Sequence, residues 1–244
     1  MKKIIYLVIV VFLFGACSST KISKSMSVEE KMAKADEFYN LEKYRKAIPY
    51  YTEVVLDRNS IYTAEAQMKL GNCYYYQDKF MEARFEYQEL IRLFKKYSNL
   101  GEAYYRIGVC YFKESLKPHY TQEETRKAIL AFETYLDKFP FHDKKEEAQD
   151  YLAKCNYKLL EKTYYNGYAY YKLSDYSSAL LYLEEVTSLN ITDELDKKAL
   201  YYSGKIFCYR KDKGNTLLVL DKMKQRYPDA DETKTIEKLL AKIK

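Results

Sequence analysis

The chain has 244 residues, of which 41 are Lys or Arg and 35 are Asp or Glu, so its formal net charge is +6. This excess is mild and forms no compact basic cluster, which argues against a nucleic-acid partner. With only 7 Gly and 4 Pro, the composition excludes a turn-rich β protein and favours long helices.

The N-terminal segment has the pattern of an export signal. Lys2 and Lys3 precede an unbroken apolar run at residues 4–14. The run is shorter than the roughly 20 residues that a membrane-spanning helix needs, and it is typical of a secretory signal peptide. It ends at Gly15-Ala16-Cys17, which resembles the lipobox of bacterial lipoproteins, although Phe14 stands where Leu is usual.

The lipobox resemblance implies that residues 1–16 are a signal peptide and that Cys17 is the lipid attachment site. The alternative is an ordinary signal peptide with an incidental cysteine. Residues 17–26 are rich in Ser, Thr and Lys, so we expect a flexible lipidated tether of about 15–18 Å.

Two short patterns recur along the rest of the chain. The first places an alanine three residues after an aromatic or polar residue, at Tyr44–Ala47, Phe80–Ala83, Thr125–Ala128 and Tyr176–Ala179. The second places an aromatic residue three positions after a glycine, at Gly71–Tyr74, Gly108–Tyr111 and Gly204–Phe207. Spacings of 36 to 37 residues between copies resemble the tetratricopeptide repeat, in which each repeat is a pair of helices.

This resemblance implies an all-α, right-handed solenoid of about five helix pairs plus a C-terminal helix. The expected pairs lie at about 28–60, 64–97, 101–140, 144–190 and 195–229, and the closing helix at 231–244. We group repeats 1–3 as residues 27–142 and repeats 4–5 as residues 143–244. The small residues Ala35, Gly71, Gly108 and Gly204 are expected to let the second helix of each pair approach the first. Capping patterns predict helix starts at Ser27-x-x-Glu30, Thr121-x-x-Glu124 and Asp143-x-x-Glu146.

Two irregularities in repeat length carry a more specific resemblance. The third copy has eight extra residues around 113–120, and the segment 144–173 contains no Pro and only Gly167, which predicts a helix lengthened by about four turns. Together with the lipobox, this pattern resembles the BamD family, lipoproteins of the machinery that assembles outer-membrane β-barrels.

The family resemblance implies a lipid-anchored protein of the outer membrane that faces the periplasm and uses no cofactor. Its N-terminal repeats would bind unfolded outer-membrane proteins, and its C-terminal repeats would dock the barrel-forming subunit. One alternative is a repeat-containing lipoprotein adaptor for peptidoglycan hydrolases or proteases. Another is a glycan-capturing outer-membrane lipoprotein, but the chain has no Trp to stack on sugars.

Candidate binding residues follow from positions relative to the small residue of each first helix. Tyr suits varied partners because it offers a large contact area with little rotamer entropy to lose, and Met re-packs readily. For each single side chain, the alternative is core packing between neighbouring repeats. The peptide-groove candidates are Met32, Tyr39, Met68, Tyr75, Tyr105 and Phe112. The partner-docking candidates are Tyr164, Tyr168, Tyr171 and Tyr201. Lys205 and Cys208 hold the equivalent outward positions in the last repeat.

No constellation of catalytic or metal-binding residues is evident. His119 and His142 lack a spaced His, Cys or carboxylate partner, and there is no Gly-rich phosphate loop. The remaining cysteines are 37 to 53 residues apart, so we expect small buried thiols, with disulfides as the alternative. These observations predict a binding protein without a catalytic, metal or cofactor site. The cysteines concerned are Cys73, Cys110, Cys155 and Cys208.

Overall fold

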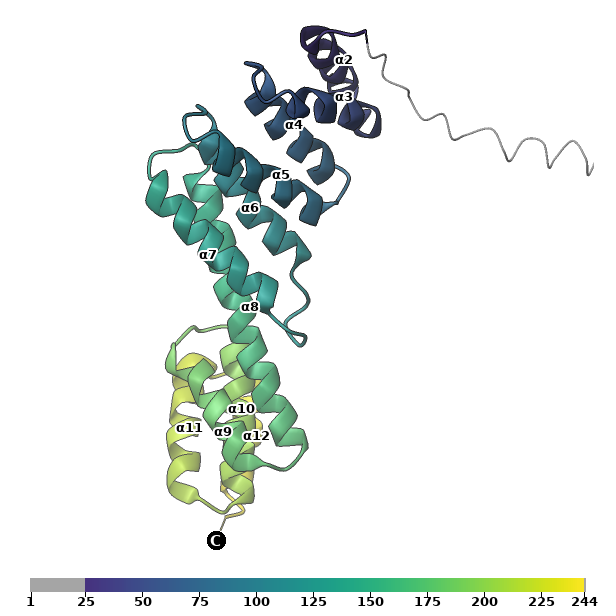
Figure 1. The fold of residues 1–244 in the computed structure, drawn as a ribbon. Helices are drawn as coiled ribbons and strands as arrows, with labels where there is room; N and C mark the ends of the chain where they lie inside the picture. Colours follow the sequence, from purple (N-terminus) through teal and green to yellow (C-terminus); the bar gives the residue numbers. More distant parts are fainter. Residues whose placement is uncertain (1–24, 244) are drawn as a thin grey trace, which may run out of the picture. The chain divides into compact units, whose positions relative to one another are not determined.

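The computed structural model describes residues 25–243, and this part of the chain contains eleven helices and no strand (Figure 1). Ten of the helices form five consecutive pairs and the last closes the chain, as the repeat pattern predicts. The predicted signal peptide and Cys17 lie outside the described residues. The helices are α2 (Val28–Asn40), α3 (Tyr44–Leu56), α4 (Thr63–Tyr75), α5 (Phe80–Leu93), α6 (Leu100–Glu114), α7 (Glu123–Lys138), α8 (Lys145–Lys172), α9 (Tyr176–Ser188), α10 (Glu194–Tyr209), α11 (Lys213–Arg226) and α12 (Asp231–Leu240).

The chain divides into two compact units, the first ending at Ala103 and the second beginning at Tyr104, within α6. We call them the N-terminal and the C-terminal unit. The repeat count suggests a division after residue 142 instead. A compact unit is defined by contacts in space rather than by the number of repeats, and repeats that contact their neighbours leave no mark of such a boundary in the sequence.

Close helix packing in the N-terminal unit depends on small residues. Ala35 in α2 is fully buried, and a Cβ atom added at Gly71 in α4 would lie 2.5 Å from Cε1 of Tyr87 in α5. The buried tyrosines opposite these positions also have hydrogen-bond partners. The Tyr51 hydroxyl donates to Asp36 Oδ1 at 2.6 Å, and the Tyr87 hydroxyl donates to Asn72 Oδ1 at 2.7 Å. Asn72 directly follows Gly71 on α4.

In the third helix pair, a glycine again lets an aromatic ring of the second helix pack closely, but this ring forms no hydrogen bond. A Cβ atom at Gly108 in α6 would lie 2.6 Å from Phe132 in α7. Phe132 has no hydroxyl, and the position that Asn72 holds in the second pair is here the buried Val109. An apolar ring thus meets an apolar neighbour, so no buried polar group is left without a partner.

The last repeat departs from the expected packing. A Cβ atom at Gly204 in α10 would first meet Ile236 of α12, at 3.0 Å, and not a residue of α11. Ile236 is fully buried. The closing helix therefore occupies the space beside Gly204 and covers apolar surface of α10.

The tight turns inside four of the five pairs share one backbone conformation. Each has a residue with positive φ two positions before the second helix, namely Glu42, Asp78, Ser174 and Lys211, with φ between 55° and 61°. This left-handed conformation costs about 1–2 kcal/mol for a residue other than Gly. The third pair has a longer connection, residues 115–122, and needs no such turn.

That longer connection confirms the predicted insertion, and side chains hold it in place. Gln122 is buried, and its Nε2 donates to the carbonyl oxygens of Lys117 at 2.8 Å and Tyr120 at 3.2 Å. From α8, Lys158 Nζ donates to Ser115 Oγ at 2.7 Å. The insertion is therefore an ordered loop attached to α8.

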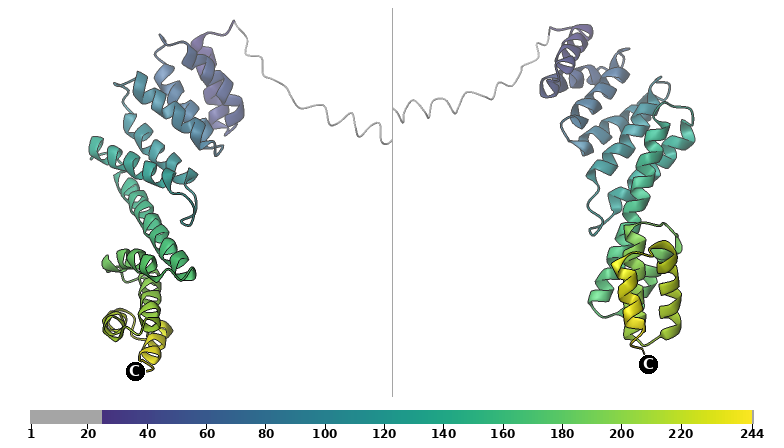
Figure 2. Two further views of the ribbon diagram at one scale, coloured as in Figure 1. Left: turned by 60° about the horizontal axis from the view of Figure 1, so that its bottom comes forward. Right: turned by 180° about the vertical axis from the view of Figure 1, so that it is seen from behind.

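The second predicted irregularity is also confirmed, because α8 is one uninterrupted helix of 28 residues (Figure 2).

One of the three predicted helix caps is confirmed. Ser27 and Glu30 form the predicted capping box. The other two predicted starts are wrong: α7 begins after Gln122 and α8 after Lys144, neither with a side-chain cap.

No helix among residues 25–243 combines the length and the apolar character needed to cross a membrane. The four cysteines at positions 73 to 208 are free thiols; Cys73, Cys110 and Cys155 are buried, as expected, whereas Cys208 is only half-buried.

Candidate protein-binding surface and pocket

Three of the six peptide-groove candidates lie in the core. Met32, Met68 and Tyr105 are 5%, 4% and 5% exposed, which corrects the expectation that they line an open surface. Each stands three residues before the small residue of its helix, and positions i and i+3 share one helix face. They therefore face the partner helix, as the small residues do. The Tyr105 hydroxyl donates to Glu147 Oε2 at 2.8 Å.

The other three candidates, Tyr39, Tyr75 and Phe112, are half-buried within aromatic clusters. The Tyr39 ring lies 5.6 Å from the Tyr44 ring and 6.4 Å from the Tyr76 ring, between centroids, and burial raises the pKa of Tyr39 to about 12. The Phe112 ring lies 5.0 Å from the Tyr151 ring. These side chains pack against neighbouring helices with part of each ring open to solvent, and their role in binding stays a prediction.

The partner-docking candidates are brought together on α8 and α10. Tyr164 is only 7% exposed and belongs to the core of the C-terminal unit, whereas Tyr168, Tyr171 and Tyr201 are half-buried. Tyr202, which the sequence analysis missed, joins them: its ring centroid lies 4.8 Å from that of Tyr171 and 5.0 Å from that of Tyr168.

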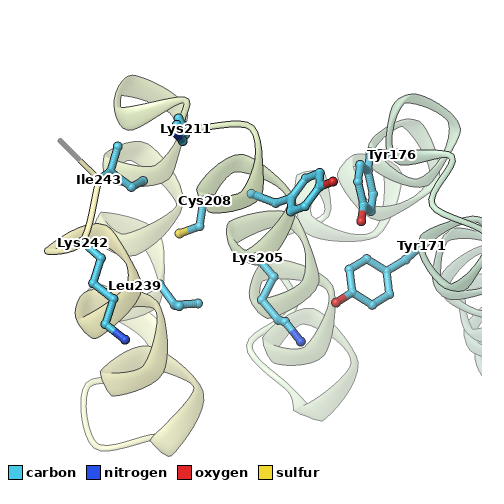
Figure 3. A pocket seen from close by; sticks show the side chains of 9 residues that line it. Tyr171, Tyr176, Lys205, Cys208, Lys211, Leu239, Lys242 and Ile243 are labelled. Atoms are coloured by element: carbon cyan, nitrogen blue, oxygen red, sulfur yellow. The ribbon is translucent and has the colours of Figure 1, made fainter.

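Next to these rings the C-terminal unit contains an open pocket of about 680 Å³, which we call the C-terminal pocket (Figure 3). Its volume falls in the range of typical ligand sites. Figure 3 shows Tyr171 and Tyr176 on one side, Leu239, Lys242 and Ile243 on the other, and Lys205 and Cys208 between them. The lining residues are Tyr171, Tyr176, Lys205, Cys208, Tyr209, Lys211, Leu239, Lys242 and Ile243.

Helix geometry and one turn place these side chains. Lys205 and Cys208 are three residues apart on α10, so they share a face. Leu239 lies in the last turn of α12, and Lys242 lies in the turn that follows it, where its backbone N–H donates to the Leu239 carbonyl oxygen. Lys211 is the residue with positive φ in the turn between α10 and α11. The pocket therefore depends on four helices, α8 to α10 and α12, meeting at one end of the unit.

The pocket is electropositive. Lys205 Nζ lies 5.5 Å from the centroid of the Tyr171 ring, and a hydrogen bond with Tyr171 raises the pKa of Lys205, so its ammonium group stays charged. Lys211 and Lys242 are exposed. Among the described residues, none of these three lysines forms an ion pair with a carboxylate.

The remaining polar groups of the pocket suit binding. Burial raises the pKa of the Cys208 thiol, which therefore stays protonated and is a weak nucleophile. Tyr171, Tyr176 and Tyr209 offer aromatic faces and hydroxyl donors. In the part of the chain that the structure describes, no group of three or more His, Cys, Asp or Glu side chains is arranged to hold a metal ion.

The sequence analysis identified only some of the residues that line this pocket. Tyr171, Lys205 and Cys208 follow from repeat position, because each stands one or four residues after a small residue. Tyr209, Lys211 and the residues of α12 carry no such signal. Leu239, Lys242 and Ile243 join the pocket only because α12 packs against α10.

Comparison with known families supports the repeat assignment. Residues 32–98 and residues 102–142 match two family models, both described as tetratricopeptide repeat. No curated protein matches the sequence.

Several solved structures are similar to this chain at low identity. The TPR2AB domain of yeast Sti1, solved in a complex with pHSP90, is 14% identical over 87% of this chain and 82% of its own, with a TM-score of 0.47. A TPR repeats protein from Bacteroides fragilis is 14% identical over 89% and 99%, with a TM-score of 0.46. YrrB, described as a TPR protein with an unusual peptide-binding site, is 18% identical over 87% and 92%, with a TM-score of 0.41. The two family matches show that residues 32–98 and 102–142 are tetratricopeptide repeats, and the later helix pairs continue the same all-helical architecture.

Proposed function

We propose that this chain is a non-catalytic scaffold that binds other proteins, and that its C-terminal pocket takes an acidic segment of a partner. The observation that carries the proposal is the grouping of Lys205, Lys211 and Lys242 with three tyrosines around one open volume. Mediation of protein–protein contacts is the usual work of tetratricopeptide repeats, and the finer assignment rests on this pocket.

The chemistry of the pocket favours carboxylates. A partner carboxylate near Lys205 would form a charge-assisted contact, which is roughly twice as strong as a neutral hydrogen bond. Tyr171 and Tyr176 would contact the apolar part of the segment and donate hydrogen bonds from their hydroxyls. Opposite charge on the two partners also speeds their encounter.

For the cellular role, we propose a lipid-anchored component of the outer-membrane β-barrel assembly machinery that faces the periplasm. Three features support this: the lipobox at Cys17, the ordered loop at residues 115–122 and the long α8. The C-terminal unit would dock the barrel-forming subunit, and the N-terminal repeats would bind unfolded outer-membrane proteins. A lipoprotein adaptor for peptidoglycan hydrolases or proteases is the competing role, since it shares the anchor and the repeats without needing the loop or the long helix.

A pull-down of the tagged full chain from its native envelope, in mild detergent, tests both levels of the proposal. We expect the wild type to recover a large outer-membrane barrel with periplasmic domains. Lys205→Glu should reduce that recovery by about tenfold or more, because it places a like charge beside the partner's carboxylates. Lys213→Glu is the matched control, since Lys213 is exposed on α11 and does not line the pocket.

The possible outcomes distinguish the proposal for the pocket from the proposal for the cellular role. Equal recovery with both variants would show that the C-terminal pocket is not the docking site. Recovery of cell-wall hydrolases or proteases without a barrel protein would replace the barrel-assembly role with the adaptor role.

A further inference from the structure

The N-terminal unit contains a second pocket, of different character, between α3, α4 and α5. It has a volume of about 410 Å³, and we call it the Glu86 pocket. Its walls are largely apolar, with contributions from Val55, Leu70, Tyr74 and Phe94. No feature of the repeat pattern predicts it.

Two carboxyl groups line the pocket beside these apolar side chains, and of the two only Glu89 is paired with an arginine among the residues that the structure describes. Glu86 precedes the buried Tyr87 on α5, which places its side chain at the edge of the core, and it is half-buried. Nε2 of Gln67, a residue 2% exposed on α4, donates a hydrogen bond to Glu86 Oε2. This contact fixes the orientation of the carboxyl group at the pocket wall.

Glu86 has no cationic partner within the described residues, whereas its neighbour is paired. Glu89, one turn further along α5, accepts from Arg92 Nε at 2.9 Å. The other ionisable groups around Glu86 are the Tyr74 hydroxyl on α4, Glu82 on α5 and the exposed Arg58 in the connection before α4, whose charge acts on Glu89. The Glu86 carboxylate therefore lacks a compensating positive charge.

As a consequence, the Glu86 carboxyl group loses its proton only at a higher pH than an ordinary glutamate. Burial, with a smaller contribution from the Glu89 charge, raises the pKa of Glu86 to about 7, although the Gln67 hydrogen bond opposes this shift. A half-buried carboxylate is stabilised most by a cation brought directly to it.

Apolar side chains surround the mouth of the pocket. Leu56 is 71% exposed and Phe85 is 59% exposed, and both line the pocket together with Leu93. Large apolar groups grouped at the mouth of a pocket mark a surface that gains free energy when a partner covers it.

We propose that the Glu86 pocket binds a lysine or arginine side chain from a protein segment whose flanking residues are apolar. The cation pairs with the Glu86 carboxylate, and the flanking side chains cover Leu56 and Phe85. Charge complementarity selects this occupant, since an acidic segment would meet Glu86 and Glu89. The site is separate from the C-terminal pocket and does not depend on the function proposed for it.

Calorimetric titration of the full chain with two capped peptides tests this inference. The first probe is acetyl-Leu-Lys-Leu-Phe-amide, and the second has norleucine in place of lysine and so keeps the chain length without the charge. The wild type should bind the lysine peptide about tenfold more tightly near pH 8 than near pH 6, because about tenfold more Glu86 is ionised at the higher pH. The norleucine peptide should bind weakly, with no such change.

Two variants locate the effect. Glu86→Gln should abolish the change in affinity with pH, whereas the matched control Glu82→Gln, an exposed residue one turn earlier on α5, should keep it. Circular dichroism of both variants shows whether the helices are retained. Equal binding of the two peptides near pH 8, or a tenfold pH effect that persists in Glu86→Gln, would overturn the proposal.

Discussion

The two units are built from the same repeat, yet they offer opposite chemistry. The pocket of the N-terminal unit contains Glu86, a carboxyl group without a cationic partner among the described residues, whereas the pocket of the C-terminal unit is lined by Lys205, Lys211 and Lys242. The repeat pattern constrains the small and aromatic residues that let paired helices approach. It leaves the outward residues free, so different repeats of one chain can carry pockets of opposite charge.

The cores of the two units also satisfy their buried polar groups differently. In the N-terminal unit, the Tyr51 and Tyr87 hydroxyls find acceptors within their own helix pair. In the C-terminal unit, Asp196 of α10 is 1% exposed and accepts from Arg226 Nη1 at 2.9 Å through both carboxylate oxygens. The Tyr227 hydroxyl donates to Asp196 Oδ2 at 2.7 Å. The acceptors in the first unit are the partly exposed Asp36 carboxylate and the Asn72 amide, whereas the acceptor in the second unit is a buried carboxylate that is paired with an arginine.

The largest expected effect breaks this ion pair. Arg226→Ala leaves the Asp196 carboxylate buried without a cation, which should reduce the free energy of unfolding by about 3–5 kcal/mol. Urea denaturation followed by circular dichroism measures the loss. Arg210→Ala is the control, because Arg210 is exposed, and it should cost less than about 1 kcal/mol. Similar losses in both variants would mean that the ion pair contributes little.

A smaller effect is expected from the close packing that both units share. Gly71→Ala places a methyl group 2.5 Å from the Tyr87 ring, which forces the ring to move, and should cost about 1–3 kcal/mol. Gly214→Ala adds the same methyl group on α11, where the nearest atom, Asp212 Oδ1, lies 3.7 Å away. It should stabilise the protein by up to about 1 kcal/mol. Thermal unfolding of the two variants compares them directly, and a shift in the same direction for both would contradict the packing argument.

The smallest expected effect is the pH dependence that Glu86 gives to the stability of the folded chain. The pKa of Glu86 is about 7 in the folded chain and about 4.3 in an unfolded one. The folded state therefore holds the proton more tightly, and stability falls as the pH rises from the unfolded to the folded value. Glu86→Gln removes this loss. Because solvent screens the half-buried carboxyl group, we expect the variant to be more stable than the wild type by only about 1–2 kcal/mol near pH 8 and nearly equal to it near pH 4.

Denaturant unfolding of the wild type and Glu86→Gln at several pH values checks this expectation. Glu82→Gln should follow the wild-type pH profile. A stability difference between Glu86→Gln and the wild type that does not change with pH would show that Glu86 titrates normally.

The helices, their pairing and the two irregularities of length can be predicted from the sequence alone. These features rest on local spacing: Gly71 and Tyr87 are 16 residues apart, and the insertion and the long α8 follow from counting residues between copies. The capping box at Ser27 was readable for the same reason. The predicted helix starts at Thr121 and Asp143 are wrong. Local spacing does not show the contacts made beside them, such as the bonds from Gln122 to the inserted loop.

Which side chains are open to a partner depends on the tertiary packing and cannot be predicted from local sequence patterns. The sequence pattern treats Met32 and Tyr39 alike, yet one is buried against its partner helix and the other is half-open beside a neighbouring repeat. The pockets combine residues from several helices, and the C-terminal pocket needs α12 beside α10. Helix formation depends on residues three or four positions apart, whereas exposure and pocket charge depend on which distant segments pack together, and that is settled when the helices assemble.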